Sequence, residues 1–261
     1  MKLCLFYGFN SLLKNNTSED ALETVKNMGF DAVEPLHDEA IYTPDKLKEL
    51  KHALSPKKLS VACYSVCVDL RDDSQLEIFK NALNNAKELN SPYIHFTLIP
   101  TLSKINSIDE YIDTVSDRAR RAAALAKDYG IRALIENQGY VFNGAASIRR
   151  LFEKVGSDNL FFCSDLGNSI FVDENPIDTA KAFTDITRHV HIKDYRYTDG
   201  SAKYTSVSGR NFFEVMPGTG ELPLKKCLEL YKDRDTAFSF EYSGGTDEIK
   251  KALCNIQSML K

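Results

Sequence analysis

The sequence has no apolar run long enough to span a bilayer and no excess of basic residues. Its 33 lysines and arginines are outnumbered by 37 aspartates and glutamates, which gives a net charge of −4. Because phosphate backbones and anionic surfaces are bound mainly through Lys and Arg, this balance argues against a nucleic-acid or membrane partner. The N-terminus, Met1-Lys-Leu-Cys-Leu-Phe-Tyr7, also lacks the long apolar region and small-residue cleavage site of a signal peptide. We therefore expect a cytoplasmic protein.

A disulfide framework is not indicated either, although the cysteine count is even. The chain is large, rich in apolar residues and without a secretion signal, so reduced thiols in the core are expected. Cys63 and Cys67 have no second cysteine pair to complete a structural zinc site. The six cysteines, which lie mostly inside apolar runs, are Cys4, Cys63, Cys67, Cys163, Cys227 and Cys254.

What the sequence does contain is a short apolar run followed by an amphipathic helical segment, repeated eight times. Thr17-Ser-Glu-Asp20 is typical of a helix start, Pro44 fits a first helical turn, and Gly29 is typical of a helix end. The strands are predicted at 3–8, 30–35, 59–66, 93–99, 131–136, 160–165, 188–193 and 236–241. The helices are predicted at 17–28, 44–54, 73–90, 107–129, 145–155, 176–183, from 223 onward, and 246–260, with an irregular segment at 194–222.

Strands that alternate with helices pair in parallel, because the chain must return through a crossover helix. Eight such units in 261 residues fit a closed (β/α)8 TIM barrel of the α/β class better than an open doubly wound sheet. The first turn after a strand, Tyr7-Gly-Phe-Asn-Ser11, contains no Gly-x-Gly-x-x-Gly, so a dinucleotide-binding fold gains no support. No linker or shift in composition divides the chain, and residues 1–261 are predicted to form one domain.

Four consecutive predicted strands, the fifth to the eighth, carry a carboxylate or an imidazole near their C-terminal ends. In a TIM barrel these ends meet at the mouth that holds the active site. Taken singly, a strand-end carboxylate can cap a helix or pair with a lysine, and a strand histidine can be a hydrogen-bonded core residue. Together, three carboxylates this close repel each other unless a cation lies among them. We therefore predict one divalent metal ion, Mn²⁺, Mg²⁺, Co²⁺ or Zn²⁺, bound by Glu136, Asp165, His191 and Glu241.

Several short motifs resemble the landmarks of a known family, and they occur in the same order. They are Gly29-Phe-Asp-Ala-Val-Glu34, Ile135-Glu-Asn137, Ser164-Asp-Leu-Gly167, His189-Val-His-Ile-Lys-Asp194, Pro217-Gly-Thr-Gly220 and Phe240-Glu-Tyr242. On these residues the chain is similar to the sugar phosphate isomerase/epimerase family, whose members are xylose-isomerase-like TIM barrels. The resemblance extends over nearly the whole chain.

The resemblance implies a metal-dependent isomerase or epimerase that acts on a small sugar or sugar phosphate. It implies that Glu136, Asp165, His191 and Glu241 bind the metal, and that Glu136 and Glu241 act as acid and base on two sides of the substrate carbon. A metal that chelates a ketone and its neighbouring hydroxyl stabilises the enediolate formed on proton loss, and a second carboxylate can return the proton. A sugar or inosose dehydratase, an endonuclease IV-like enzyme and a non-catalytic sugar-binding barrel are the alternatives. The few histidines and the acidic balance disfavour the endonuclease.

Residues around the predicted ligands are candidates for substrate contacts. Asn168 stands where the family frequently has a histidine, and its amide can hydrogen-bond a substrate hydroxyl. The position of the family's substrate arginine is Tyr197 here, with Arg196 one residue earlier as the candidate. Glu34 and His95, near the ends of the second and fourth strands, either contact substrate or support the ligands from behind.

Three other features have more than one interpretation each. Lys193 and Asp194 either serve the site or form a salt bridge at the rim. The segment 243–246 either binds phosphate through backbone N–H groups or forms a turn and an N-cap. The aromatic and basic segment 194–222 is either a lid or a contact in a homo-oligomer, or else an ordinary surface excursion.

Overall fold

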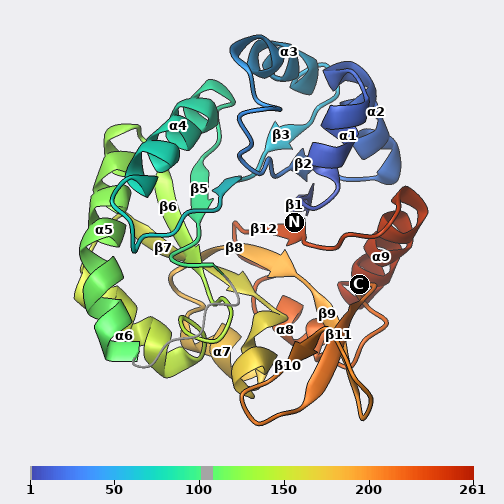
Figure 1. Cartoon of the computed structure of the whole chain (residues 1–261). Helices are drawn as coiled ribbons and strands as arrows, with labels where there is room; N and C mark the ends of the chain where they lie inside the picture. Colours follow the sequence, from blue (N-terminus) through green and yellow to red (C-terminus); the bar gives the residue numbers. More distant parts are fainter. Residues whose placement is uncertain (1, 101–107) are drawn as a thin grey trace.

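The computed structural model describes residues 2–100 and 108–261 as a ring of parallel strands with helices around it (Figure 1). Nine strands form one sheet in the order β3-β2-β1-β12-β8-β7-β6-β5-β4, and every pairing in it is parallel. The strands are β1 Lys2–Leu5, β2 Ala32–Val33, β3 Ser60–Val61, β4 Tyr64–Val66, β5 Tyr93–Phe96, β6 Arg132–Glu136, β7 Leu160–Asp165, β8 Thr187–Ile192 and β12 Ala237–Phe240.

The two end strands of this sheet, β3 and β4, are parts of one extended stretch. Only residues 62 and 63 separate them, so the predicted third strand at 59–66 is divided in two. On the far side of the break, the backbone N–H of Ser65 donates to the carbonyl oxygen of Pro35 at 2.8 Å, and Leu36 bridges to Ser65 in parallel. The sheet therefore returns to its own beginning as a nearly closed barrel, which confirms the predicted TIM barrel.

Local sequence signals explain where several helices begin and end. The side-chain oxygen of Thr17 accepts a hydrogen bond from the backbone N–H of Asp20 at 3.1 Å, as an N-cap does. Gly29 ends α2 with a φ of 101°, a left-handed conformation that favours glycine. The helices are α1 Phe9–Asn15, α2 Ser18–Met28, α3 Pro44–Leu54, α4 Gln75–Glu88, α5 Ile108–Asp128, α6 Ala145–Val155, α7 Pro176–Ala182, α8 Leu224–Glu229 and α9 Thr246–Met259. Position 107 of the predicted helix 107–129 lies outside the described residues.

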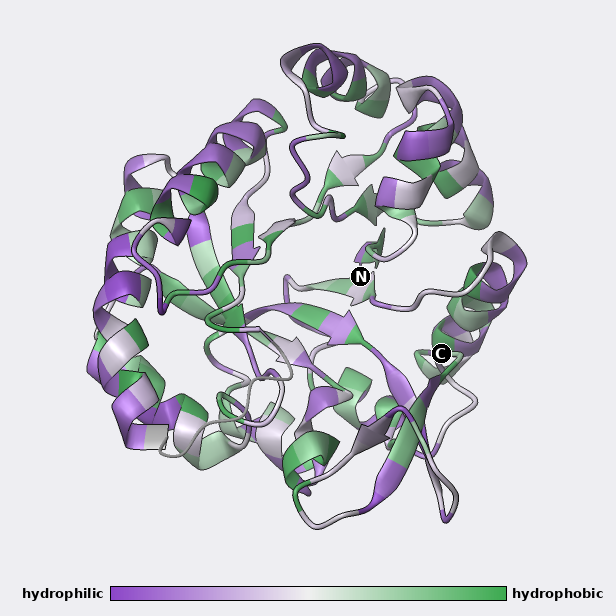
Figure 2. Ribbon diagram, in the orientation of Figure 1, coloured by the Kyte–Doolittle hydropathy of each residue, from purple (hydrophilic) through white to green (hydrophobic). Residues whose placement is uncertain are grey.

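The helices turn apolar residues toward the strands and polar residues outward (Figure 2). In α4 the buried residues are Phe79, Ala82, Leu83 and Ala86, which follow the i, i+3, i+4, i+7 spacing of one helical face. The sequence does not predict α1 or the short 3-10 helix η1, Asn168–Val172. Over residues 2–100 and 108–261, none of the helices has the length and apolar character needed to cross a bilayer.

The segment 194–222, expected to be irregular, instead contains a small antiparallel sheet, so this prediction is wrong. Its strands are β9 Asp194–Thr198, β10 Tyr204–Thr205 and β11 Asn211–Val215, in the order β10-β11-β9. The physical reason is aromatic burial. Tyr195 and Phe212 pack edge-on at 5.3 Å between ring centres, and both contact Phe171 of η1, which gives this sheet a core of its own.

The Asp194 carboxylate fixes the far end of this segment. It accepts hydrogen bonds from the backbone N–H groups of Tyr195 at 3.0 Å, Gly218 at 3.0 Å and Gly220 at 2.8 Å. An added Cβ at Gly220 would lie 2.1 Å from Oδ1 of Asp194, so the close approach requires glycine. Asp194 therefore anchors a loop, and its carboxylate accepts from backbone N–H groups of this segment.

We expect Asp194→Ala to lower the free energy of unfolding by about 2 to 4 kcal/mol, because four backbone donors, the N–H group of Leu222 included, lose one charged acceptor. Urea denaturation monitored by circular dichroism measures this. Asp199→Ala, at an exposed position of the same segment, is the control and should change the free energy by less than about 0.5 kcal/mol. Equal costs for the two variants would show that the carboxylate does not anchor the loop.

Candidate metal centre

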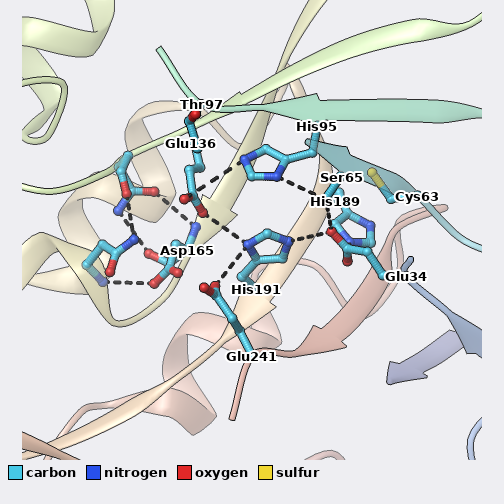
Figure 3. Close-up of polar contacts among 12 residues, drawn as sticks. Glu34, Cys63, Ser65, His95, Thr97, Glu136, Asp165, His189, His191 and Glu241 are labelled. Atoms are coloured by element: carbon cyan, nitrogen blue, oxygen red, sulfur yellow. Dashed lines mark hydrogen bonds and ion pairs between the residues drawn. The ribbon is translucent and has the colours of Figure 1, made fainter. Parts of the chain in front are cut away.

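The four predicted ligands come together at the C-terminal mouth of the barrel (Figure 3). Glu136 ends β6, Asp165 ends β7, His191 lies one residue before the end of β8, and Glu241 directly follows β12. These four strands are consecutive in the sheet, and the register places Asp165 beside His191. One potential ligand atom from each residue lies within 4.8 Å of the others, and all four side chains are buried.

His191 is the centre of the group, and its two ring nitrogens face different partners. Nδ1 lies 3.0 Å from Oε2 of Glu136 and 3.2 Å from Oε2 of Glu241. Nε2 lies 3.1 Å from Oε1 of Glu34, on the inner side of the ring. If Nε2–H donates to Glu34, Nδ1 keeps its lone pair toward the mouth, which is the arrangement that histidine ligands to metals use.

Several buried polar atoms around this point lack a hydrogen-bond partner. They are Oδ2 of Asp165, Oε2 of Glu241 and Nε2 of His95. The other carboxylate oxygen of Asp165 is already engaged, because Oδ1 accepts the backbone N–H groups of Gly167 and Asn168, both at 2.8 Å. Oδ2 of Asp165 and Oε2 of Glu241 have ion-pair contacts only, to Lys193 and His191 respectively. Buried acceptors are normally hydrogen-bonded, so carboxylate oxygens of this kind beside an imidazole nitrogen fit a divalent cation.

The sequence profile of the xylose isomerase-like TIM barrels matches residues 22–259 of the chain. The chain belongs to this family. Among curated protein sequences, no relative is found.

Solved structures similar to this xylose isomerase-like barrel cover it end to end at low identity. The probable 3-DHS dehydratase AsbF, involved in petrobactin synthesis in Bacillus anthracis, has a TM-score of 0.82 at 16% identity over 100% of this chain and 99% of that chain. D-psicose 3-epimerase with D-tagatose from Clostridium cellulolyticum H10 has a TM-score of 0.78 at 14% identity over 100% of both chains. A xylose isomerase-like TIM barrel protein from Mycobacterium smegmatis in complex with magnesium has a TM-score of 0.71 at 15% identity over 100% of this chain and 96% of that chain. At these identities the likeness establishes the fold.

Lys193 lies inside the candidate centre of this xylose isomerase-like barrel. Its ammonium nitrogen is 3.1 Å from Oδ2 of Asp165, 2.9 Å from Oε1 of Glu241 and 3.4 Å from Oδ1 of Asn168. Only 12% of the side chain is exposed. The sequence allowed a rim salt bridge here. The structure shows ion pairs to two of the predicted ligands.

Glu34 and His95 form a buried layer behind the centre. Both carboxylate oxygens of Glu34 are used inside the barrel: Oε2 lies 2.7 Å from Nε2 of His189, and Oε1 faces His191 and accepts from the Ser65 hydroxyl. Nδ1 of His95 lies 3.1 Å from the same hydroxyl, and its Nε2 lies 3.9 Å from Oε1 of Glu136. Burial raises the pKa of Glu34, but His191 and His189 outweigh it and hold that pKa well below its usual value. These contacts favour the supporting role over a substrate contact for Glu34.

The remaining candidates lie in two different places. Asn168, at the start of η1, is buried, and its amide donates to the carbonyl oxygen of Asn137 at 2.9 Å. Arg196 is exposed on β9, where its guanidinium donates to the carbonyl oxygen of Thr219 and not to any of the four predicted ligands among the described residues. At the N-terminus of α9, a carboxylate of the same helix accepts a backbone hydrogen bond, because the N–H group of Gly245 donates to Oε2 of Glu248 at 3.0 Å. The turn-and-cap interpretation of 243–246 therefore describes this segment.

Two carboxylates of the centre have pKa values displaced in opposite directions. Burial raises the pKa of Asp165 to about 7, an effect that Lys193 opposes and that the neighbouring Glu241 strengthens. Burial also acts on Glu241, but Lys193 and His191 hold its pKa below the usual range. Because the folded pKa of Asp165 exceeds its ordinary value of 3.8, this group stabilises the metal-free fold at low pH. That stability is lost as the pH rises through about 7.

The raised pKa of Asp165 predicts that metal binding competes with a proton. We expect the chain to bind Mn²⁺ about tenfold more weakly at pH 6 than at pH 8, because a proton must leave Asp165 at the lower pH. Calorimetric titrations in two buffers of different ionisation enthalpy measure both the affinity and the protons released. Equal affinities at the two pH values, with no proton release at pH 6, would contradict an Asp165 ligand that is protonated near neutral pH.

Proposed function

We propose that this barrel is a metal-dependent isomerase or epimerase of a small sugar or sugar phosphate. The observation that carries the proposal is the position of Glu136 and Glu241, two buried carboxylates that approach the Nδ1 side of His191 from different strands. Membership in the xylose isomerase-like TIM barrel family supports it. So does the D-psicose 3-epimerase among the similar structures, whose described ligand is the ketose D-tagatose.

The contacts of the site residues suggest a separate role for each of them. Glu136, Asp165, His191 and Glu241 would hold the ion, which supplies positive charge to the substrate oxygens when a neighbouring C–H proton leaves. One of the two glutamates removes the proton, and the other returns one, either to the same carbon or to its neighbour. Glu34 fixes the orientation of the His191 ring from behind.

A dehydratase is the second candidate, and Lys193 favours it. Elimination of water begins with the same proton loss but also needs an acid that protonates the departing hydroxyl. The Lys193 ammonium lies 2.9 Å from Glu241, so an acid and a base stand side by side at the mouth. The probable dehydratase AsbF shares this fold over its whole length. The products separate the two functions, because only the dehydratase lowers the substrate mass by one water.

The test starts with the metal content of the purified chain, measured by inductively coupled plasma mass spectrometry. The Mn²⁺-loaded protein is then incubated in heavy water with a panel of ketoses and ketose phosphates, and deuterium at carbon is followed by NMR. We expect about one ion per chain and deuterium incorporation into at least one substrate. Absence of bound metal, with neither deuterium incorporation nor loss of water across the panel, would contradict the proposal.

A further inference from the structure

The ammonium group of Lys193 forms ion pairs with two carboxylates of the candidate metal centre, those of Asp165 and Glu241. Its nitrogen lies between Oδ2 of Asp165 at 3.1 Å and Oε1 of Glu241 at 2.9 Å. Within residues 2–100 and 108–261, no other lysine or arginine forms an ion pair with the four predicted ligands. The charge of these buried carboxylates is therefore balanced by a side chain of the same site.

The position of Lys193 in the chain explains why it reaches this point. Successive side chains of a strand alternate between its two faces, so His189, His191 and Lys193 share the inner face of β8 and its continuation. His189 and His191 both contact Glu34, which places them in the interior. Lys193 follows as the next inward side chain, toward the mouth.

The Lys193 ammonium and a divalent metal ion would compete for the same carboxylate oxygens of Asp165 and Glu241. Oδ1 of Asp165 already accepts two backbone N–H groups, so Oδ2 is the oxygen left for a cation, and Lys193 lies beside it. Oε1 of Glu241 faces the same ammonium, while Oε2 faces His191. A divalent ion at these carboxylates and the ammonium at its present distances repel each other strongly, because both are positive in a buried site.

We propose that Lys193 is the internal counter-cation of the metal-free site, and that the divalent ion displaces it from Asp165 and Glu241 on binding. The inference rests on the proposed metal site. Oδ1 of Asn168, 3.4 Å from the ammonium, is the neutral acceptor beside which the displaced group stays at the mouth. The fold thus keeps its buried carboxylates paired before metal arrives, since unpaired buried charges are costly.

The test is a calorimetric titration of the metal-free chain with Mn²⁺ at pH 8, together with thermal melting of the metal-free and Mn²⁺-loaded forms. Lys193→Met should bind Mn²⁺ at least about tenfold more tightly than the wild type, because the competing cation is gone. Its metal-free form should melt at a lower temperature than the wild type, and Mn²⁺ should raise its melting temperature further than it raises that of the wild type. Lys127→Met, which removes an exposed ion pair to Asp158, is the matched control and should change neither quantity.

The outcomes separate this inference from the proposed function. A wild type that binds Mn²⁺ at one site, with an equal or weaker affinity in Lys193→Met, overturns the counter-cation and leaves the metal site intact. No saturable Mn²⁺ binding in any of the chains removes the metal site and the inference with it. Crystal structures of the wild type with and without Mn²⁺ give a readout that does not depend on the variant folding. An ammonium that stays beside Oδ2 of Asp165 in the loaded chain also overturns the inference.

Discussion

The Glu136→Gln and Glu241→Gln variants should each lose conversion of substrate to product, with the rate falling about 100- to 10,000-fold. Glutamine keeps the shape of the side chain but cannot accept a proton at neutral pH. If the two glutamates serve as the two bases, the reaction requires both, and either substitution interrupts it. Formation of the deuterated product from the best substrate of the ketose panel, measured by NMR in heavy water with excess Mn²⁺, gives the rate.

Loss of metal would also reduce the rate, so bound Mn²⁺ is measured in the same samples. Glu229→Gln, at an exposed position of α8, is the control and should keep the wild-type rate. Full conversion of substrate to product in either variant at normal metal occupancy would exclude that glutamate as a base. A loss of conversion that is matched by an equal loss of bound Mn²⁺ would assign the residue to metal binding alone.

That the four predicted ligands meet at the mouth of the barrel could be predicted from the sequence, because their position depends only on the direction of the strands. Runs of apolar residues end at Glu136 and Asp165, and parallel strands place such ends at one edge of the barrel. Glu241 follows its strand directly, so an error of one residue in the strand boundary does not move it from the mouth. The spacing of apolar residues and the position of polar residues at the strand ends are therefore enough to predict where the four ligands lie.

The buried layer of Glu34 and His95 behind the candidate metal centre forms only when the sheet closes into a barrel. No local sequence pattern encodes that closure. Glu34, which directly follows β2, and His189 of β8 are 155 positions apart. The two strands do not pair in the sheet, yet Oε2 of Glu34 lies 2.7 Å from Nε2 of His189 across the interior. The ion pairs of Lys193 depend in the same way on how far the strand continues beyond Ile192 before the chain turns into β9. The antiparallel sheet within 194–222 escaped prediction because its stability comes from aromatic residues packed against η1.

Removal of the Glu34 carboxylate should be among the most destabilising single changes in the barrel. Glu34 is fully buried and contacts His189, His191 and the Ser65 hydroxyl, so Glu34→Ala leaves three polar groups without their acceptor. We expect the free energy of unfolding to fall by about 3 to 5 kcal/mol, the usual cost when one partner of a buried ionic network is removed. Urea denaturation of the metal-free chain measures it. Glu49→Ala, which removes an exposed ion pair to Lys46, should cost less than about 1 kcal/mol.

The milder variant, Glu34→Gln, separates the structural role of this residue from its effect on the metal. An amide can still accept the Nε2–H of His191 through its oxygen, but it lacks the charge that strengthens the imidazole as a ligand. The fold should therefore survive while the affinity for Mn²⁺ falls about 10- to 100-fold, as is usual when the group that orients a histidine ligand is altered. Calorimetric titration at pH 8 measures the affinity. Unchanged Mn²⁺ affinity together with a raised KM for the sugar would instead place Glu34 in contact with substrate, against its position behind His191.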